Sequence, residues 1–339
     1  MTGLLALILT AVALPPLLAR LIGGHAPRPG PQLAALAPAA TVPATAAVIV
    51  AAFSAWWLAL LLAIPAAILL AWQLPPRHNA RAINPVAQRV AAWSVRDPVT
   101  VRVLTLNSRG GSADAAALVA VLRQHQVDVL AIQELTWDLV HRLDEASLAS
   151  VLPHSHLDPR PRSPGVGLWA RWPLAPLPPV PGMVAAAPRA RAEPLPGRPV
   201  VLTAVHPLTP MRCSAHPWQR DLTRLLPLAE TEGPQVVAGD FNATRDHQAF
   251  RDLLAAGFAD CADIAQHRTW PGFTWPTSSD LDSDRKKRKK RRIPDQRALP
   301  VMRLDHVLVT PASTTVRTAR PIRVPGTDHH AVLAVIDFA

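Results

Sequence analysis

The pattern of apolar and polar positions predicts strands and helices over the last two thirds of the chain. Short apolar segments of strand length are separated by polar or turn-forming residues, and most of them end in a polar side chain. Catalytic groups tend to lie where strands meet loops, because the scaffold there is rigid and the end is open. The predicted strands cover residues 101–106, 128–132, 200–205, 236–238, 303–309 and 331–338.

Apolar residues at helical spacing predict helices between these strands, and Ser112 suits the cap of the first helix. Residues 153–199 contain 13 prolines, which exclude a long helix and favour short edge strands and ordered loops. By pattern alone, strands alternating with helices would indicate a parallel sheet. The predicted helices cover residues 114–126, 136–150, 216–230 and 246–256.

The segment Gly239-Asp240-Phe241-Asn242 is the most informative strand end. Gly239 is expected to be the point where the chain leaves the core. On an extended backbone, residues two apart point to the same side, so Asp240 and Asn242 are expected to face one site. A carboxylate and an amide held there suit the orientation of a water or a metal. The alternative is a turn cap, since Asp and Asn favour such positions.

Other polar residues stand in similar places. Asp305 lies inside an otherwise apolar strand, and a buried acid needs a partner. Glu134 could instead begin the following helix, and His206 could be an ordinary loop residue before Pro207. The residues that occupy strand ends or interrupt strands are Asn107, Glu134, His206, Asp240, Asn242, Asp305, Asp328 and His329.

In this order, these residues resemble the endonuclease/exonuclease/phosphatase superfamily, which has the DNase-I-like fold. The resemblance covers roughly residues 99 to 339 and implies a four-layer sandwich of two packed mixed β-sheets flanked by helices. Pattern alone does not give that architecture. The matching segments are Leu104-Thr105-Leu106-Asn107, Ile132-Gln133-Glu134, Ala238-Gly239-Asp240-Phe241-Asn242, Arg303-Leu304-Asp305-His306 and Thr327-Asp328-His329.

The resemblance implies a divalent cation, Mg²⁺ with Mn²⁺ as the alternative. Glu134 is the first candidate ligand, Asn107 lies beside it as a carbonyl ligand or orienter, and Asp328 lies on the metal side. A hard cation of this kind prefers one or two carboxylates together with waters and phosphate oxygens. The sequence therefore supplies a set of oxygen donors of the right chemistry.

The resemblance also implies the catalytic roles. Asp240, steadied by Asn242, would orient or deprotonate the attacking water, and His206 would donate to a phosphate oxygen. His329 would contact the scissile phosphate, and Asp305 would accept its ring N–H and fix its tautomer. By strand alternation, the neighbouring His306 and His330 are expected to point away from the site.

The chain departs from the family pattern in a few places. It contains no tyrosine, which disfavours the abasic-site nucleases, and it lacks the Trp- and Cys-containing signatures of the inositol phosphatases. Residues 165–174 resemble the family's central strand, with Ala170 in place of the usual serine. The two cysteines, Cys213 and Cys261, are too few to define a disulfide framework.

The front of the chain predicts a membrane anchor at residues 1–76. Two spans are expected, roughly 3–22 and 46–72, because each is long and apolar enough to cross a bilayer. Three shorter spans are the alternative, since the second apolar region carries no charged residue and could hold a helical hairpin. A signal peptide is disfavoured, because no basic residue precedes Leu4 and the second apolar stretch would remain.

Residues 77–98 read as a linker to the catalytic domain at 99–339. By the positive-inside rule, the side of the membrane on which the catalytic domain lies depends on which group of arginines stays in the cytoplasm. One group, Arg20 and Arg28, lies between the two spans, and the other, Arg77, Arg81 and Arg89, follows the second span. The resemblance to bacterial membrane-anchored members favours a multi-pass protein of the cell membrane with an extracytoplasmic catalytic domain.

A basic insertion at residues 280–297 dominates the charge. Eight consecutive positive residues, Arg285 to Arg292, account for most of the formal net charge, since +11 minus 8 leaves +3. Such a run suits contact with anionic lipid or nucleic acid, each charge contributing about 1 kcal/mol near a membrane. The alternative is a solvated insertion, and the acids Asp280, Asp282 and Asp284 would weaken any contact.

These observations favour a membrane-anchored, metal-dependent phosphodiesterase whose substrate is a polyanionic phosphate ester, either nucleic acid or a lipid head group. A phosphomonoesterase of the same fold and a non-catalytic binding module on that fold are the alternatives. A transporter or channel is disfavoured, because it needs more spans and a polar residue within the membrane, and the front third of the chain supplies neither.

Overall fold

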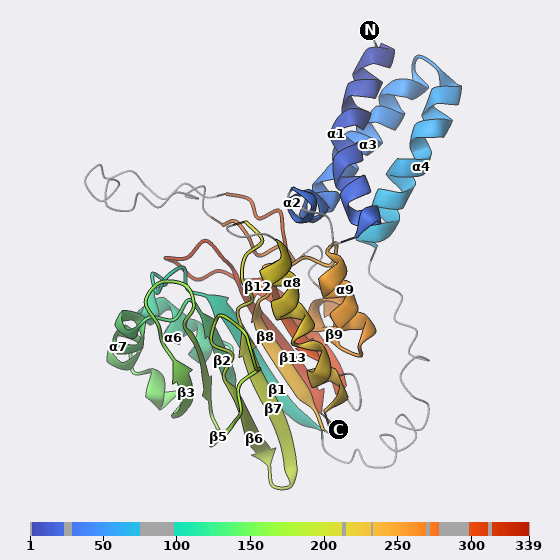
Figure 1. Ribbon diagram of the computed structural model, residues 1–339. Coiled ribbons are helices and arrows are strands. Elements are labelled where there is room, and N and C mark those ends of the chain that lie inside the picture. The colour runs from blue at the N-terminus through green and yellow to red at the C-terminus, as the bar shows by residue number, and fades with distance from the viewer. Residues whose placement is uncertain are drawn as a thin grey trace, which may run out of the picture.

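The computed structural model describes residues 2–23, 29–74, 98–211, 215–231, 233–268, 272–277, 298–310 and 314–338. These residues form an N-terminal helical bundle and a two-sheet domain (Figure 1). Most of the linker predicted at 77–98, the whole basic run at 285–292 and Cys213 lie outside the described residues.

The bundle packs three long helices side by side, with a short helix at the end nearest the two-sheet domain (Figure 1). α1 (Thr2–Ile22) and α4 (Trp56–Gln73) are long and apolar enough to cross a bilayer, judged by length and composition. Many of their large apolar side chains are exposed, as at Leu5, Ile8 and Trp57. The other two helices are α2 (Gly30–Ala35) and α3 (Ala37–Ala52).

The second expected span, 46–72, is not one continuous helix. α3 ends at Ala52, and the backbone of Ala55 is extended, with φ −158° and ψ 95°, before α4 begins at Trp56. The apolar composition shows how long the stretch compatible with a membrane is. It does not show where within that stretch one helix ends and the next begins. α3 and α4 therefore form a hairpin of two separate helices, and the number of membrane spans stays a prediction.

Two mixed sheets form the core of the second domain. The first sheet has the order β10 (His267–Arg268), β12 (Thr314–Ile322), β13 (Ala331–Phe338), β1 (Val99–Asn107), β2 (Val129–Gln133), β4 (Val166–Ala170) and β3 (His154–Asp158). The second has the order β5 (Ala175–Leu177), β6 (Arg189–Leu195), β7 (Arg198–Val205), β8 (Gln235–Asp240), β11 (Asp305–Val309) and β9 (Ala259–Asp260). The proline-rich segment supplies edge strands β3 and β5, as its composition predicts.

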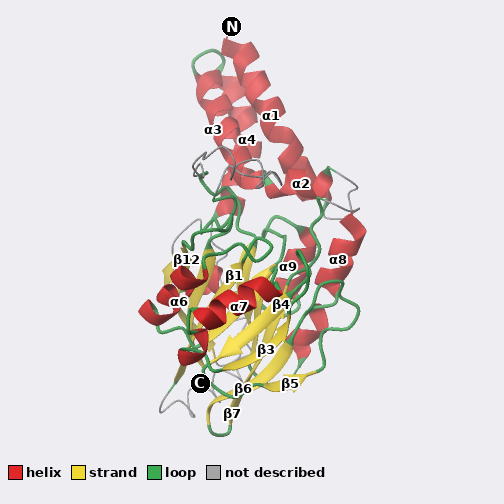
Figure 2. Ribbon diagram, turned by 90° about the vertical axis from the view of Figure 1, so that its left-hand side faces the viewer, coloured by secondary structure: helices red, strands yellow, loops and turns green. Residues whose placement is uncertain are grey.

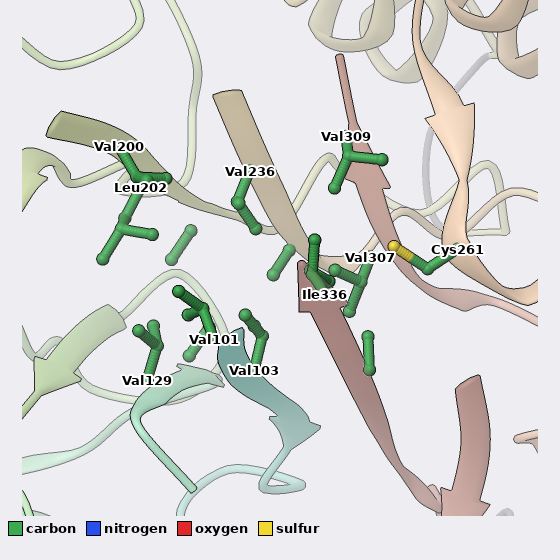
Figure 3. Close-up of a cluster of buried hydrophobic side chains, with 14 of the residues drawn as sticks. Val101, Val103, Val129, Val200, Leu202, Val236, Cys261, Val307, Val309 and Ile336 are labelled. Carbon is green, nitrogen blue, oxygen red and sulfur yellow. The ribbon is translucent and has the colours of Figure 1, made fainter. Parts of the chain in front are cut away.

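The sheets pack face to face through small branched side chains, which Figure 3 shows between strands of both sheets. A second apolar cluster joins the first sheet to α6 (Ala115–Gln124) and α7 (Trp137–Glu145). A third joins the second sheet to α8 (Ala215–Thr223) and α9 (Gln248–Ala255). The layers are therefore helix, sheet, sheet, helix, and the predicted four-layer sandwich is confirmed.

Helix ends differ from the predictions by a few residues. Asp114, rather than Ser112, caps α6 by accepting a hydrogen bond from Ala117 N at 3.0 Å. Thr136 caps α7, which ends at Glu145 and is followed by a separate 3-10 turn, η1 (Leu148–Ser150). The helix expected at 216–230 is divided in the same way into α8 and the 3-10 turn η2 (Leu226–Glu230). The short helix α10 (Cys261–Ile264) follows β9.

Strand direction brings the predicted polar residues to one end of the sandwich. β1 runs parallel to β2, and β7 runs parallel to β8, so these strands finish at the same end. β11 and β13 are antiparallel to β8 and β1, so they begin at that end. This end, named the site end below, faces the helical bundle, while the C-terminus and the β6–β7 hairpin lie at the opposite end (Figures 1 and 2).

Gly239 does not mark the exit from the core, as the sequence suggested. It lies within β8, paired with Val205 on one side and His306 on the other. A Cβ at this position would overlap the carbonyl oxygen of Val205. Gly239 is therefore required for close approach of neighbouring strands, and β8 continues to Asp240.

Candidate active site

The centre of the site is the contact between Asn107 and Asp240, which come from different sheets. Asn107 ends β1, Asp240 ends β8, and the Nδ2 group of Asn107 donates to Asp240 Oδ2 at 2.9 Å. Both side chains are buried. The hydrogen bond therefore ties the site ends of the two sheets together and fixes one oxygen of the carboxylate.

Asp305 and His329 form a buried pair beside this contact. His329 Nδ1 lies 2.9 Å from Asp305 Oδ2, and Thr274 Oγ1 accepts from the backbone N–H of Asp305 at 3.3 Å. Burial alone would lower the pKa of His329, but the carboxylates of Asp305, Asp240 and Asp328 outweigh it and raise this pKa to about 10. Burial also raises the pKa of Asp305. Both shifts keep a proton in the pair at neutral pH.

His206 also faces Asp240. Its Nδ1 donates to the carbonyl oxygen of Ser163 at 3.0 Å, which leaves Nε2 directed at the site, 3.7 Å from Asp240 Oδ2. His329 Nε2 lies 3.9 Å from the same oxygen. Both distances exceed a hydrogen bond, so two imidazole Nε2 atoms flank the carboxylate without being bound to it.

The expectation that Asn242 shares a strand face with Asp240 is wrong. β8 ends at Asp240, and Asn242 adopts a left-handed conformation with φ 48°. Its backbone N–H donates to Asp240 Oδ1 at 2.8 Å, whereas its side chain donates to the carbonyl oxygen of Pro207 at 3.0 Å. Asn242 therefore steadies Asp240 through its backbone and holds the loop after β7 through its amide.

Glu134 and Asp328 meet the loop that follows β1. Glu134 Oε2 accepts a hydrogen bond from Gly110 N at 2.6 Å, and Arg109 Nε lies 3.9 Å from Asp328 Oδ1. Glu134 has φ 55° and precedes the cap of α7, so it lies in a turn and does not begin the helix. The two half-buried carboxylates therefore both meet the loop that follows β1.

Several supporting residues were not assigned roles from sequence. Thr327 Oγ1 donates to the carbonyl oxygen of Asn107 at 2.7 Å and accepts from His329 N at 3.2 Å. The ring of Trp275 lies 6.5 Å from that of His329, centroid to centroid. Arg142 donates to the carbonyl oxygens of Gly111 and Ala113 and so clamps the loop after β1. Thr327 belongs to the segment Thr327-Asp328-His329, whereas nothing local in the sequence points to Arg142.

His306 lies where strand alternation predicts. His306 is buried behind the site, with Nδ1 2.7 Å from Asp260 Oδ2 and Nε2 2.9 Å from the carbonyl oxygen of Ala243. It packs against Phe241 and Phe250. His330 is half-buried, and its backbone N–H donates to Thr274 O at 2.8 Å. His306 therefore serves packing on the far side of the strand.

The donors present fit a hard divalent cation. Glu134 and Asp328 offer carboxylate oxygens, and Asn107 Oδ1, which accepts from Arg109 N at 2.9 Å, retains a second lone pair. Donor atoms of Asp240, Asp305 and His329 also lie within 4.8 Å of one another. That cluster is already held by the hydrogen bond between His329 and Asp305, whose proton a cation would have to displace.

The comparisons with known proteins agree with this geometry. The chain belongs to the Endonuclease/Exonuclease/phosphatase family, whose sequence profile matches residues 104–329. Members of this family are generally hydrolytic phosphoesterases that depend on a divalent metal. No curated protein sequence matches the chain.

Solved structures share the fold at low sequence identity. TDP2 from D. rerio, complexed with a single-strand DNA product, is 16% identical, with a TM-score of 0.54, and the alignment covers 70% of this chain and 98% of TDP2. A conserved protein of unknown function from Enterococcus faecalis is also 16% identical, with a TM-score of 0.51, covering 70% of this chain and 100% of the other. At this identity the likeness establishes the fold alone.

Proposed function

We propose that the chain is a membrane-anchored, metal-dependent phosphoesterase that hydrolyses a phosphodiester by in-line attack of water. The observation that carries the proposal is the convergence of Asp240, two flanking imidazoles and the Asp305 partner at one end of the sandwich. Charge neutralisation on the transferring group and an aligned nucleophile are what phosphoryl transfer requires.

Asp240 is the group that orients and accepts a proton from the attacking water. Its Oδ1 is held by Asn242 N and its Oδ2 by the amide of Asn107, so the carboxylate cannot rotate away. An ionised carboxylate is an acceptor only, and each oxygen has a further lone pair for the water. Holding this base in place supplies the positioning on which the rate of such a reaction depends.

His329 donates to a phosphoryl oxygen, and His206 would add a second donor as an imidazolium, because its Nδ1 proton is already held by the carbonyl oxygen of Ser163. Because the pKa of His329 is raised to about 10, its ring is an imidazolium at neutral pH and both its nitrogens are donors. Nδ1 is occupied by Asp305, which leaves the Nε2 proton for a phosphate oxygen. His206 presents its Nε2 from the other sheet.

Glu134, Asp328 and the carbonyl oxygen of Asn107 would hold the divalent cation. When bound, Mg²⁺ or Mn²⁺ supplies Lewis-acid stabilisation of the charge on the phosphoryl group. The loop at Arg109–Gly110 fixes the direction of the Glu134 carboxylate, so this part of the site is prepared by the protein.

The proposal of a membrane anchor rests on the bundle. Its outward faces expose large apolar side chains over several turns, an arrangement that water disfavours and a bilayer accommodates.

The side of the membrane on which the catalytic domain lies stays a prediction. An extracytoplasmic domain follows from the family resemblance, whereas Arg20 lies at the domain end of the bundle and further arginines follow α4 in the sequence, and the positive-inside rule assigns an end rich in arginine to the cytoplasm. A tag-accessibility assay at the C-terminus distinguishes the two.

The test of the activity uses the full chain in detergent with Mg²⁺ and the soluble diester bis(p-nitrophenyl) phosphate. Hydrolysis should stop with a chelator and return with excess Mg²⁺. Glu134→Gln should raise the Mg²⁺ concentration required by about tenfold to 100-fold, while Glu145→Gln, an exposed acid at the end of α7, should not. Hydrolysis that is indifferent to the chelator contradicts the metal-dependent mechanism. Faster turnover of p-nitrophenyl phosphate favours the phosphomonoesterase, and absence of all turnover favours the binding module.

A further inference from the structure

The helical bundle contacts the catalytic domain through the loops that leave the site. Arg20 of α1 forms an ion pair with Asp246, and its guanidinium lies 4.1 Å from the ring centroid of Trp72. His247 Nε2 donates to the carbonyl oxygen of Pro31 at 2.8 Å. Asp246 and His247 follow β8, the strand that ends in the catalytic carboxylate. The end of the bundle therefore adjoins the site end of the sandwich (Figures 1 and 2).

The loop after β7 makes the same connection. Gln32 of α2 donates to the carbonyl oxygen of Pro210 at 2.9 Å, and Asn242 donates to that of Pro207 at 3.0 Å. Residues 206–210 thus run from His206 in the site to a contact with the bundle. The spacing between site and bundle is set by direct contacts and not by the linker alone.

The bundle end at this contact has the composition of a membrane interface. Arg20 and Trp72 stand at the domain-side ends of α1 and α4, and both residue types are enriched where a helix leaves the hydrocarbon. Because Arg20 touches Asp246 directly, the loops around the site lie at about the level of the lipid head groups.

Exposed apolar side chains of the catalytic domain gather at the same end. In the part of this domain that the structure describes, six large apolar residues are exposed, and only Leu195, in the β6–β7 hairpin, lies at the far end. The others lie in segments that leave or enter strands at the site end: Trp137, Val184, Met211, Leu299 and Val301. Single exposed apolar residues are ordinary, but their confinement to one end is typical of a surface that meets an apolar partner.

We propose that the catalytic domain rests on the bilayer with its site end towards the lipid, and that its substrate is the phosphodiester head group of a membrane lipid. This assignment rests on the proposed phosphoesterase function and specifies its substrate class. Apolar side chains at the rim enter the acyl boundary, which holds the site at the depth of the head-group phosphates. A nucleic acid would instead have to lie between this rim and a surface that anionic lipids make negative, which repels it.

The test uses the full chain reconstituted in vesicles of phosphatidylcholine and phosphatidylglycerol, with release of phosphorylated head group as the readout. Leu299→Glu and Met211→Glu replace rim residues that are 87% and 62% exposed, and Leu195→Glu is the matched control at the far end. A charge in place of an inserted apolar side chain should lower vesicle hydrolysis by about tenfold in each rim variant. Turnover of bis(p-nitrophenyl) phosphate in detergent should stay unchanged in all three variants, which also shows that they fold.

Equal vesicle hydrolysis by Leu299→Glu, Met211→Glu and Leu195→Glu would overturn docking of the rim on lipid. Faster cleavage of an oligonucleotide than of either phospholipid would overturn the lipid assignment in favour of nucleic acid. Turnover of the soluble diester with neither phospholipid cleaved would overturn the lipid assignment and leave the phosphoesterase intact. Absence of turnover of every substrate by the wild-type chain would instead overturn the proposed function itself.

Discussion

His329 Nδ1 lies 2.9 Å from Asp305 Oδ2, and both side chains are buried. The carboxylate fixes the direction of the ring and keeps it protonated, so that Nε2 faces the site as a charged donor. His329 lies two residues before β13 and Asp305 begins β11, so this one hydrogen bond joins the two sheets at the site end. It determines whether the imidazole can act on a phosphate at neutral pH.

Replacing Asp305 by Asn should lower kcat at neutral pH by about 100-fold or more, because the ring loses its charge partner and its fixed tautomer. The pH profile should also change. The wild-type pKa of about 10 lies above the ordinary value, so activity that needs the imidazolium is complete at lower pH and is lost only as pH rises through 10. In the variant the same loss should begin nearer neutrality.

The pH dependence of kcat/KM checks this, with Asp337→Asn as the control. Asp337 is a carboxylate of β13 at the far end, where it pairs with Arg317. An Asp305→Asn profile that overlays the wild-type profile would exclude the pair from the mechanism.

Thr327 is a positioning residue whose hydroxyl links Asn107 O and His329 N. Thr327→Val keeps the shape of the side chain and removes both hydrogen bonds, so kcat should fall about tenfold with KM little changed. Thr314→Val is the matched control, since the Thr314 hydroxyl donates to Thr310 O at the start of β12, away from the site. Equal effects of the two substitutions would show that Thr327 contributes only to stability.

Gly239→Ala should destabilise the catalytic domain by about 3 kcal/mol or more, because the new Cβ overlaps the Val205 carbonyl oxygen inside a buried sheet. Gly197→Ala lies in the open β6–β7 hairpin with φ 74° and has no atom within 4 Å of the added Cβ. Its cost should be about 1 kcal/mol, which is the backbone term alone. Denaturant unfolding of both variants measures the difference, and a Gly239→Ala cost no larger than that of Gly197→Ala would refute the close-approach argument.

His247 predicts acid sensitivity at the contact between bundle and domain. Burial lowers its pKa to about 4, and in the neutral ring Nδ1 accepts from Thr244 N while Nε2 donates to Pro31 O. The unfolded chain binds this proton near pH 6.5, so it holds more protons than the folded chain between pH 6.5 and 4, and stability falls as pH falls through that window.

The loss from His247 should be about 3 kcal/mol over this window, at 1.36 kcal/mol for each unit of pKa shift. Other groups titrate there too, so the measurement is the difference between wild type and His247→Gln in the free energy of unfolding at pH 7 and pH 4.5. Gln can still donate to Pro31 O but does not titrate. A pH dependence identical in both proteins would show that His247 is not the sensitive group.

Much of the site could be predicted because its residues sit at the ends of apolar strands, where local pattern is strong. Asn107, Asp240 and Asp305 all lie at strand ends, and the apolar runs beside them locate those ends. The conformation of Asn242 could not be predicted in this way, because alternation holds only while the backbone stays extended, and β8 ends at Asp240.

Contacts between segments far apart in the chain could not be predicted from the sequence. The apolar pattern predicted strands and helices but not their arrangement in two mixed sheets, because the order in which strands pair does not depend on local periodicity. The family resemblance supplied that arrangement. The ion pair of Arg20 with Asp246 and the pairing of His306 with Asp260 join residues far apart in the chain, with no local signature. A hairpin in this part of the chain was one of the alternatives, but the position of the helix reversal at Phe53–Ala55 could not be predicted, because every neighbouring residue is uncharged.

The most direct test of the central claim compares two adjacent histidines, His329 and His330. His329 faces Asp240 and pairs with Asp305, while His330 is half-buried and lies between His329 and β13. With the full chain, Mg²⁺ and bis(p-nitrophenyl) phosphate, His329→Ala should lower kcat by about 1,000-fold, and His330→Ala should keep kcat within about threefold of wild type. A His329→Ala protein that stays folded and retains wild-type kcat would contradict the account.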